Sequence, residues 1–181
     1  RGMLGADVYL HAKRPVSPKA EELLSSQPGR MQKEVAFTTM ARRTAGDESR
    51  LVQARAVEEG WPFFGKPVTE PRDAWARCLA GEGFVADPAL AEQLAAKPGD
   101  SIKIGELERP LLGVFIRPPP QVSLMGAFAP ELFFAHRLVP DTKLDPASGL
   151  TFHRRWLLFA DGYDVDKLFA AAKILVQNAE T

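Results

Sequence analysis

The chain has 181 residues, 45% hydrophobic and 25% charged, a composition typical of folded globular domains rather than disordered or fibrous chains. Its 23 basic and 23 acidic side chains balance without any long block of like charge, which argues against a nucleic-acid partner. A single cysteine, Cys78, excludes an internal disulfide, and no segment reaches the about 18 consecutive apolar residues of a membrane-spanning helix.

The first third of the chain predicts a strand, a helix and a hairpin. Alternating β-favouring residues indicate a strand over residues 6–11. Ser17 and the proline after it predict the start of a helix that runs to residue 27. Residues 33–43 and 50–57 are extended segments joined by a glycine-containing turn, so we expect an antiparallel hairpin. The two-residue period of a strand places Val52, Ala54 and Ala56 on one of its faces.

The middle of the chain predicts shorter elements. Residues 58–72 have proline and glycine but no periodicity, which indicates a linker. We expect a helix over 73–81, a strand over 83–87 and a second helix that starts at Pro88. A hairpin follows over 101–116, and its second strand is apolar on both faces and therefore buried. We expect Asp87 to cap this second helix. Helical spacing places the following residues on one side of it: Leu90, Ala91, Leu94 and Ala95.

The last third predicts an apolar loop over 121–130, strands over 131–138 and 151–160, and a final helix that begins near Asp164. That helix carries an apolar stripe that should lie on a sheet. The order strand, helix, two strands, inserted middle, strand, helix indicates an α+β protein with a split α/β sandwich. The stripe consists of Val165, Leu168, Phe169, Ala172, Leu175 and Val176.

Signals for catalysis are weak. The chain has no serine-hydrolase elbow, no P-loop and no zinc-protease motif, and we predict neither a cofactor nor a metal. His11, His136 and His153 each fall in a predicted strand without a second ligand at metal-binding spacing, although a site assembled in space stays open. Residues 153–155, His-Arg-Arg, either receive a phosphate or anionic lipid or alternate as exposed strand positions. Cys78 has no nearby histidine to activate it.

Two apolar segments stand out. Residues 60–65, GWPFFG, concentrate three aromatic side chains between glycines, and residues 122–128 place large apolar side chains on a predicted loop. Such segments either fill the core beneath a linker or contact a partner, lipid or apolar ligand. The candidate contact residues are Trp61, Phe63, Phe64, Leu124, Met125 and Phe128.

Four segments together resemble a known family. They are LGADVYLHAKRP (4–15), GDESRLVQARAVEEGWPFFGKP (46–67), FVADPALAEQLAAKPGDSIKIGE (84–106) and FAPELFF (128–134). In this order they are similar to the extracytoplasmic domain of the MacB/FtsX-like ABC transporter permeases, with the YbbP-type permeases as the nearest branch. Trp61 stands where that branch usually has tyrosine, and the segment after Phe134 departs from its pattern.

The resemblance implies a periplasmic portion of an inner-membrane protein, placed between the first two membrane helices of a permease that works with a separate cytoplasmic ATPase. It implies an outer α/β lobe, porter-like, over 1–61 and 137–181, and an inserted, β-rich, sabre-like lobe over 62–136. It also implies a non-catalytic role that couples helix motion to a periplasmic partner, esterase-like in this branch, or to a hydrophobic substrate. The start at Arg1 rather than Met suggests a piece of a longer protein. The alternatives are a module that binds a lipid or small apolar molecule and a free-standing hydrolase.

Overall fold

The structure is a computed structural model that describes residues 6–119, 129–145 and 151–179. Its helices are α1 (Pro18–Ser25), α2 (Ala74–Leu79), α3 (Pro88–Gln93) and α4 (Val165–Ala179), with a 3-10 helix η1 (His136–Thr142). Its strands are β1 (Val8–Ala12), β2 (Gly29–Arg43), β3 (Ser49–Val57), β4 (Val68–Glu70), β5 (Phe84–Ala86), β6 (Ser101–Ile104), β7 (Leu107–Arg117), β8 (Glu131–Ala135) and β9 (Thr151–Phe159).

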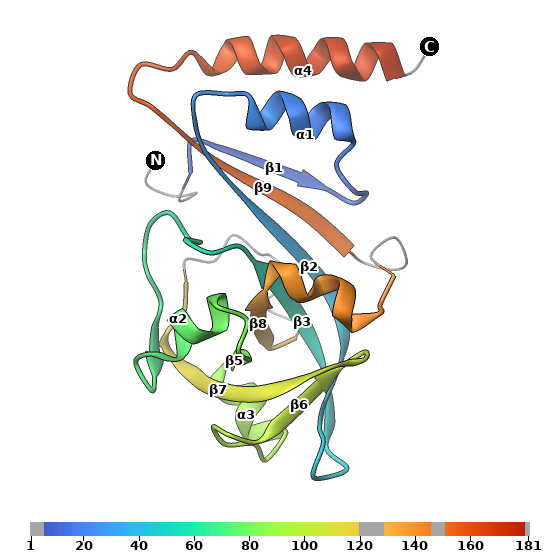
Figure 1. Ribbon diagram of the computed structural model, residues 1–181, viewed down its shortest axis with the longest axis vertical. Coiled ribbons are helices and arrows are strands. Elements are labelled where there is room, and N and C mark those ends of the chain that lie inside the picture. Colours follow the sequence, from blue (N-terminus) through green and yellow to red (C-terminus); the bar gives the residue numbers. More distant parts are fainter. Residues whose placement is uncertain (1–5, 120–128, 146–150, 180–181) are drawn as a thin grey trace.

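The strands form one mixed sheet in the order β1-β9-β2-β3-β8-β5-β7-β4, and β6 pairs with both β2 and β7. Because β6 joins these two strands, the path β2-β3-β8-β5-β7-β6 closes on itself as a small barrel, visible in the lower half of Figure 1. The β3–β8 and β5–β7 pairs are parallel, and the other pairs are antiparallel. The predicted mixed α+β class is confirmed.

Strand β2 belongs to two parts of the sheet. Its residues 29–37 pair with β9, whereas residues 41–43 pair with β6 in the barrel. Its other edge pairs with β3 over residues 34–42, in the antiparallel hairpin that the sequence predicts. The sheet therefore continues without a break from the open part that holds β1 and β9 into the barrel. The division into lobes at residues 62 and 136 stays a prediction.

Three groups of buried apolar side chains hold the fold together. The barrel interior contains Val52, Ala54 and Ala56, which share a face as predicted and are each 0% exposed. A second group, rich in aromatic rings, lies where α2 and the loop after β3 cover the barrel. The third lies beneath α1 and α4 at the end of the molecule shown at the top of Figure 1.

Helix α1 starts as predicted, because Oγ of Ser17 accepts a hydrogen bond from the backbone N–H of Ala20 at 3.3 Å. Helix α4 also starts as predicted, since Oδ1 of Asp164 accepts from the N–H of Asp166 at 3.1 Å. It lies beside α1, and Leu168 is buried in the third group. Phe169 is 59% exposed, so the predicted apolar stripe does not lie wholly against a sheet.

Several sequence expectations were wrong in detail. The predicted linker 58–72 contains strand β4, which pairs with β7 at an edge. Asp87 forms no side-chain hydrogen bond that caps α3. Ala95 is exposed with a φ of 48°, because the helix ends at Gln93. His136 begins the 3-10 helix instead of extending a strand, and Ile116 is 64% exposed at the end of β7.

Candidate functional site

A buried network of charged side chains lies where the open part of the sheet meets the barrel, and Glu34 of β2 is at its centre. Glu34 is 0% exposed, and its Oε1 accepts hydrogen bonds from Nε of Arg55 at 2.7 Å and from Nη1 of Arg154 at 2.8 Å. Its Oε2 accepts from the indole N–H of Trp156 at 2.9 Å. One carboxylate thus joins β2, β3 and β9.

Strand register brings these side chains together. Glu34 is directly opposite Arg154 on β9 and opposite Val57 on β3. Arg55 lies two residues before Val57, so its side chain emerges on the same face as Glu34 and reaches it diagonally. Trp156 reaches the carboxylate from β9 in the same way, because its direct partner is Gln32. Side chains that the two-residue period puts on one face here meet across three strands.

The network extends through Arg55 to the next strand of the barrel. Its Nη1 donates to Oε1 of Glu131 at 3.2 Å, and Glu131 lies on β8, the parallel neighbour of β3. The backbone N–H of Glu131 donates in turn to Oδ2 of Asp87 at 2.7 Å, just before α3. Arg55 and Glu131 are each 1% exposed, so these groups interact with one another instead of with water.

Burial alone raises the pKa of a carboxyl group, and the neighbours decide the outcome. For Glu34 that effect is outweighed by the charges of Arg55 and Arg154 and by its hydrogen bonds, so its pKa lies below the ordinary value. Burial raises the pKa of Glu131, and although Arg55 opposes it, the negative charge of Asp87 adds to the rise. Burial likewise raises the pKa of Asp87.

Aromatic rings enclose the guanidinium group of Arg55. Its Cζ lies 4.7 Å from the ring centre of Phe133 and 5.1 Å from that of Trp61, within the range of cation–π contacts. Trp61 is 2% exposed, and its ring lies 5.8 Å from Phe133 and 6.2 Å from both Trp75 and Trp156. The charge network and the aromatic group therefore form one connected interior.

The structure separates the candidate contact residues predicted from the sequence. Trp61 lies in the core, Phe63 is half-buried with Arg30 over its ring at 5.1 Å, and Phe64 is 44% exposed. The other three candidates, Leu124, Met125 and Phe128, lie outside the described residues. Any contact role of the six residues stays a prediction.

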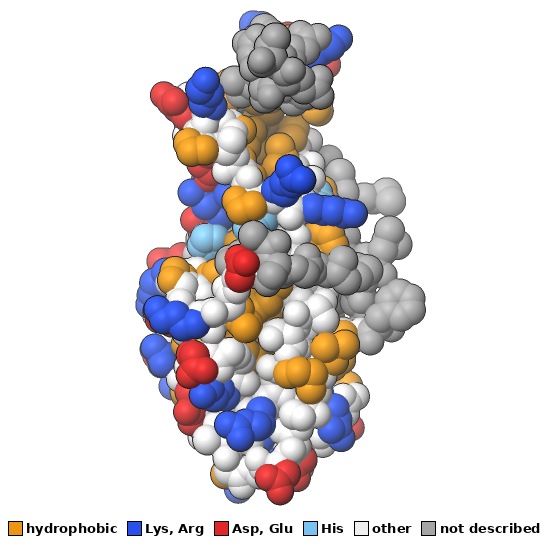
Figure 2. Space-filling view, turned by 90° about the vertical axis from the view of Figure 1, so that its right-hand side faces the viewer, with side chains coloured by type: hydrophobic (Ala, Val, Ile, Leu, Met, Phe, Trp, Pro, Cys, Tyr) orange, Lys and Arg blue, Asp and Glu red, His pale blue; other side chains and the backbone are white. Residues whose placement is uncertain are grey.

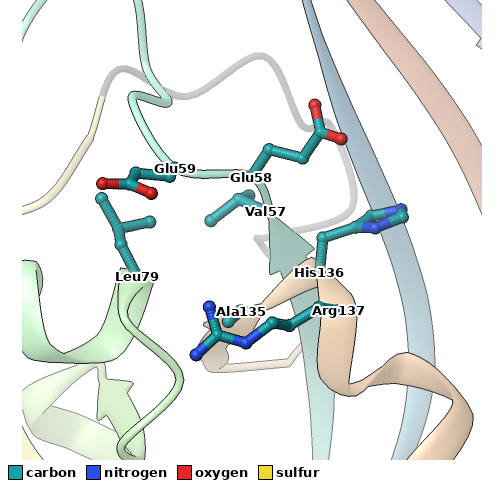
Figure 3. Close-up of a pocket in the computed structure, with 7 residues that line it drawn as sticks. All are labelled: Val57, Glu58, Glu59, Leu79, Ala135, His136 and Arg137. Atoms are coloured by element: carbon teal, nitrogen blue, oxygen red, sulfur yellow. The ribbon is translucent and has the colours of Figure 1, made fainter.

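Two hollows with shared lining residues lie beside this interior. The larger, of about 450 Å³, lies between the loop of residues 59–67 and α2, and Trp61 and Trp75 line it. The smaller, of about 170 Å³, lies between the end of β3, α2 and the start of η1. Glu59 and Leu79 line both. Figure 3 shows the smaller hollow, in which Arg137 extends toward α2 while Glu58 and His136 point to the side of β2.

The burial of residues 153–155 contradicts both interpretations drawn from the sequence, an anion site and alternating exposed strand positions. His153, Arg154 and Arg155 are 7%, 3% and 7% exposed, so they neither alternate at the surface nor form an open anion site. The reason is the position of β9, which lies between β1 and β2 instead of at an edge. Arg155 forms an ion pair with Glu21 of α1 at 2.9 Å.

The sequence interpretation missed Glu34, Arg55 and Glu131. The signal is present, because each is a charged residue inside or at the end of an otherwise apolar extended segment. Arg55 stands between two alanines that are 0% exposed in the barrel interior, and its own, opposite face of β3 is covered by Trp61 of the following loop. A charge in such a strand indicates a buried partner of opposite sign.

The described residues contain no group of three or more His, Cys, Asp or Glu side chains that could hold a metal ion. Cys78 is fully buried, and burial raises its pKa to about 12, which keeps the thiol protonated and unreactive near neutral pH. Within the same residues no helix is long and apolar enough to cross a membrane. On the face shown in Figure 2, acidic and basic side chains mix over the lower half.

The sequence is similar to one curated protein, an uncharacterized ABC transporter permease, YbbP, of Escherichia coli strain K12. The two are 27% identical over 157 residues, which cover 86% of this chain but only 19% of the permease. The chain thus spans about a fifth of the length of the curated relative that it matches. No protein-family model matches the chain.

Two solved structures share the fold. The extracellular domain of YknZ, a noncanonic ABC-type transporter from Gram-positive bacteria, has a TM-score of 0.58 at 13% identity, covering 93% of this chain and 87% of that domain. The periplasmic region of MacB from Actinobacillus actinomycetemcomitans has a TM-score of 0.53 at 12% identity, covering 92% of this chain and 75% of that region. The predicted extracytoplasmic location agrees with both. The resemblance to the MacB/FtsX-like ABC transporter permeases is confirmed: the sequence is similar to that of a YbbP permease, and the fold is that of the extracytoplasmic domains of YknZ and MacB.

Proposed function

We propose that this extracytoplasmic permease domain transmits movement of the membrane helices of its transporter to a partner or hydrophobic substrate outside the membrane. A separate cytoplasmic ATPase supplies the driving force, and the domain itself catalyses no reaction. The similarity to a YbbP permease supports the transporter part of the proposal, and the ATPase follows from that type of transporter. A domain with this task needs a rigid structure and does not need catalytic residues.

The observation that carries the proposal is the network around Glu34. It ties β9 of the open part of the sheet to β3 and β8 of the barrel through groups that are at most 3% exposed. Strand β2 also runs through both parts without interruption. A displacement applied at α1 and α4 is therefore passed to the barrel instead of being absorbed at a joint.

The test uses the full-length permease with its ATPase in lipid vesicles. Exposed Lys97, after α3, and exposed Ala170, on α4, are each replaced by cysteine and labelled, and buried Cys78 stays unlabelled because its pKa is raised to about 12. Energy transfer from the Lys97→Cys label to fluorescent lipids also measures the distance between the barrel and the membrane. We expect ATP to change the transfer to lipid and leave the distance between the two labels unchanged.

A permease paired with an ATPase unable to hydrolyse ATP is the control for turnover. The Glu34→Gln variant should broaden the distribution of distances between the two labels, because Arg55 and Arg154 lose their common partner. The proposal is wrong if ATP is hydrolysed while energy transfer from the Lys97→Cys label to the lipid stays unchanged.

An exposed apolar pair supports a protein partner on the barrel. Met40 on β2 and Leu51 on β3 are direct neighbours in the register and are 50% and 53% exposed. Adjacent apolar side chains at the surface are typical of contact sites. The esterase-like periplasmic partner is tested by co-purification with the full-length permease. We expect Met40→Glu with Leu51→Glu to weaken it, and Lys97→Glu with Arg109→Glu to leave it unchanged.

A further inference from the structure

We propose that the larger hollow beside α2 binds an anionic amphiphile with a single acyl chain, such as a fatty carboxylate or a lysophospholipid with a net negative head group. Its chain would lie on Trp61 and Trp75, and its head group would lie beside Lys66 and Arg72. This site is tested on the 181-residue chain alone and does not depend on the transmission function proposed above.

The floor of the hollow is apolar and large enough for such a chain. Trp61, Pro62, Pro67 and Trp75 are all buried and line it, and partly buried Leu79 lines both this hollow and the smaller one. Its volume of about 450 Å³ falls in the range of about 300–1,000 Å³ typical of small-molecule sites. Each methylene group removed from water there contributes about 0.8 kcal/mol.

The floor is already in place without a ligand. The ring of Trp61 is fixed between Phe133, at 5.8 Å, and the guanidinium group of Arg55, at 5.1 Å. The loop that carries it is held to β2, because the side-chain amide of Gln32 donates to the carbonyl oxygen of Glu59 at 3.4 Å. A preformed site loses little conformational entropy when it binds.

The charged side chains around the hollow favour a negatively charged ligand and determine its orientation. Lys66 and Arg72 are exposed at the rim of the larger hollow, and neither forms an ion pair with any residue that the structure describes. Glu59 lines both hollows, and its negative charge repels an anion from that side of the larger one. An anionic head group is therefore favoured beside Lys66 and Arg72, with the chain extending toward Leu79.

A hydrocarbon chain fits this floor better than an extended peptide does. A peptide that binds as a strand needs backbone N–H and C=O groups to pair with. Pro62 and Pro67 have no N–H, and the N–H of Trp61 is already donated to the carbonyl oxygen of Glu58 at 3.1 Å. The hollow thus offers apolar contact and two cations but no backbone ladder.

The probe is bromine-labelled dodecanoate, which quenches tryptophan fluorescence on contact. Two of the three tryptophans line the hollow, so we expect saturable quenching of part of the signal. Ala76 is exposed on α2 and lines the hollow, so Ala76→Phe should fill it and weaken binding at least tenfold. Ala170→Phe, at an exposed position on α4, is the matched control and should bind as the wild-type chain does.

Charge reversal tests the head group. Lys66→Glu with Arg72→Glu should weaken dodecanoate binding about tenfold, since two exposed attractions become repulsions. Lys19→Glu with Lys97→Glu changes the net charge equally at exposed sites elsewhere and should have no effect. If lysophosphatidylglycerol displaces the probe, the site also accepts a phosphate head group. If it does not, the ligand is restricted to carboxylates.

Unsaturable quenching overturns the proposal, as does equal binding of dodecyltrimethylammonium. It is also overturned if Ala76→Phe and its control lose binding to the same extent. Thermal unfolding of each variant separates loss of the site from loss of the fold.

Discussion

Arg154 on β9 donates a hydrogen bond from Nη1 to Oε1 of Glu34 on β2, at 2.8 Å, with the two side chains 3% and 0% exposed. The same oxygen accepts from Arg55, so one negative charge serves two buried cations. Breaking a buried pair from one side leaves a charge without compensation, whereas an exposed pair contributes little.

Glu34→Gln should therefore destabilise the chain by about 3–5 kcal/mol, because Arg55 and Arg154 stay buried without their shared carboxylate. Urea unfolding followed by circular dichroism measures the change. Glu48→Gln is the control, since Glu48 pairs with Arg43 at the partly exposed hairpin turn. We expect that control to change stability by less than about 1 kcal/mol. Equal effects of the two substitutions would contradict the role given to the network.

Trp61 and Phe64 are three residues apart in an aromatic segment, yet they differ in burial at 2% and 44% exposed. Trp61→Ala should cost about 3–5 kcal/mol, since it opens a cavity and removes a ring from Arg55. Phe64→Ala should change stability by no more than about 0.5 kcal/mol. Thermal unfolding of both variants checks the difference. A large loss for Phe64→Ala would place that side chain in the core.

Gly105 and Gly99 both have positive φ, 53° and 98°, but only Gly105 is closely packed. A Cβ atom at Gly105 would lie 2.1 Å from the carbonyl oxygen of Thr142, whereas one at Gly99 would meet nothing within 4 Å. Alanine at either position carries backbone strain of about 1–2 kcal/mol. Gly105→Ala should cost about 1–3 kcal/mol more, as measured by urea unfolding, because the hairpin turn must move away from η1. Equal costs would show that the turn does not press on η1.

Acidification should weaken the fold through His136. Burial keeps its pKa below the ordinary 6.5, with Arg155 and Lys33 adding to the effect and Glu58 opposing it. The unfolded chain then takes up the proton first, so stability falls as the pH drops from about 6.5 toward the folded pKa. His136→Asn should flatten stability against pH in that window, as urea unfolding at several pH values will show. An unchanged slope would mean that another group carries the dependence.

Local patterns predicted much of this fold. Ser17 and Asp164 cap helices as expected, and the β2–β3 hairpin has the predicted face of small apolar residues, because these features depend on neighbours in sequence. Closure of the barrel was not predictable in the same way. It depends on β6 pairing with β2 across about 60 residues, and no local period encodes that pairing.

The candidate site shows the same limit. The aromatic segment around Trp61 was identified from composition, but its division into core and surface depends on what packs above it. Glu34, Arg55 and Glu131 look like ordinary strand charges until the register places them together. The sequence alone does not show which strands are neighbours when they are far apart along the chain.

The place of β9 also affects how the chain is made. Residues 151–159 are synthesised after the other strands that the structure describes, yet they occupy the position between β1 and β2. Until the ribosome has passed Phe159, β1 and residues 29–37 of β2 expose backbone edges that have no strand to pair with. A nascent chain in this state is open to mispairing with other chains. Such a protein gains from a chaperone that shields β1 and β2 until β9 arrives.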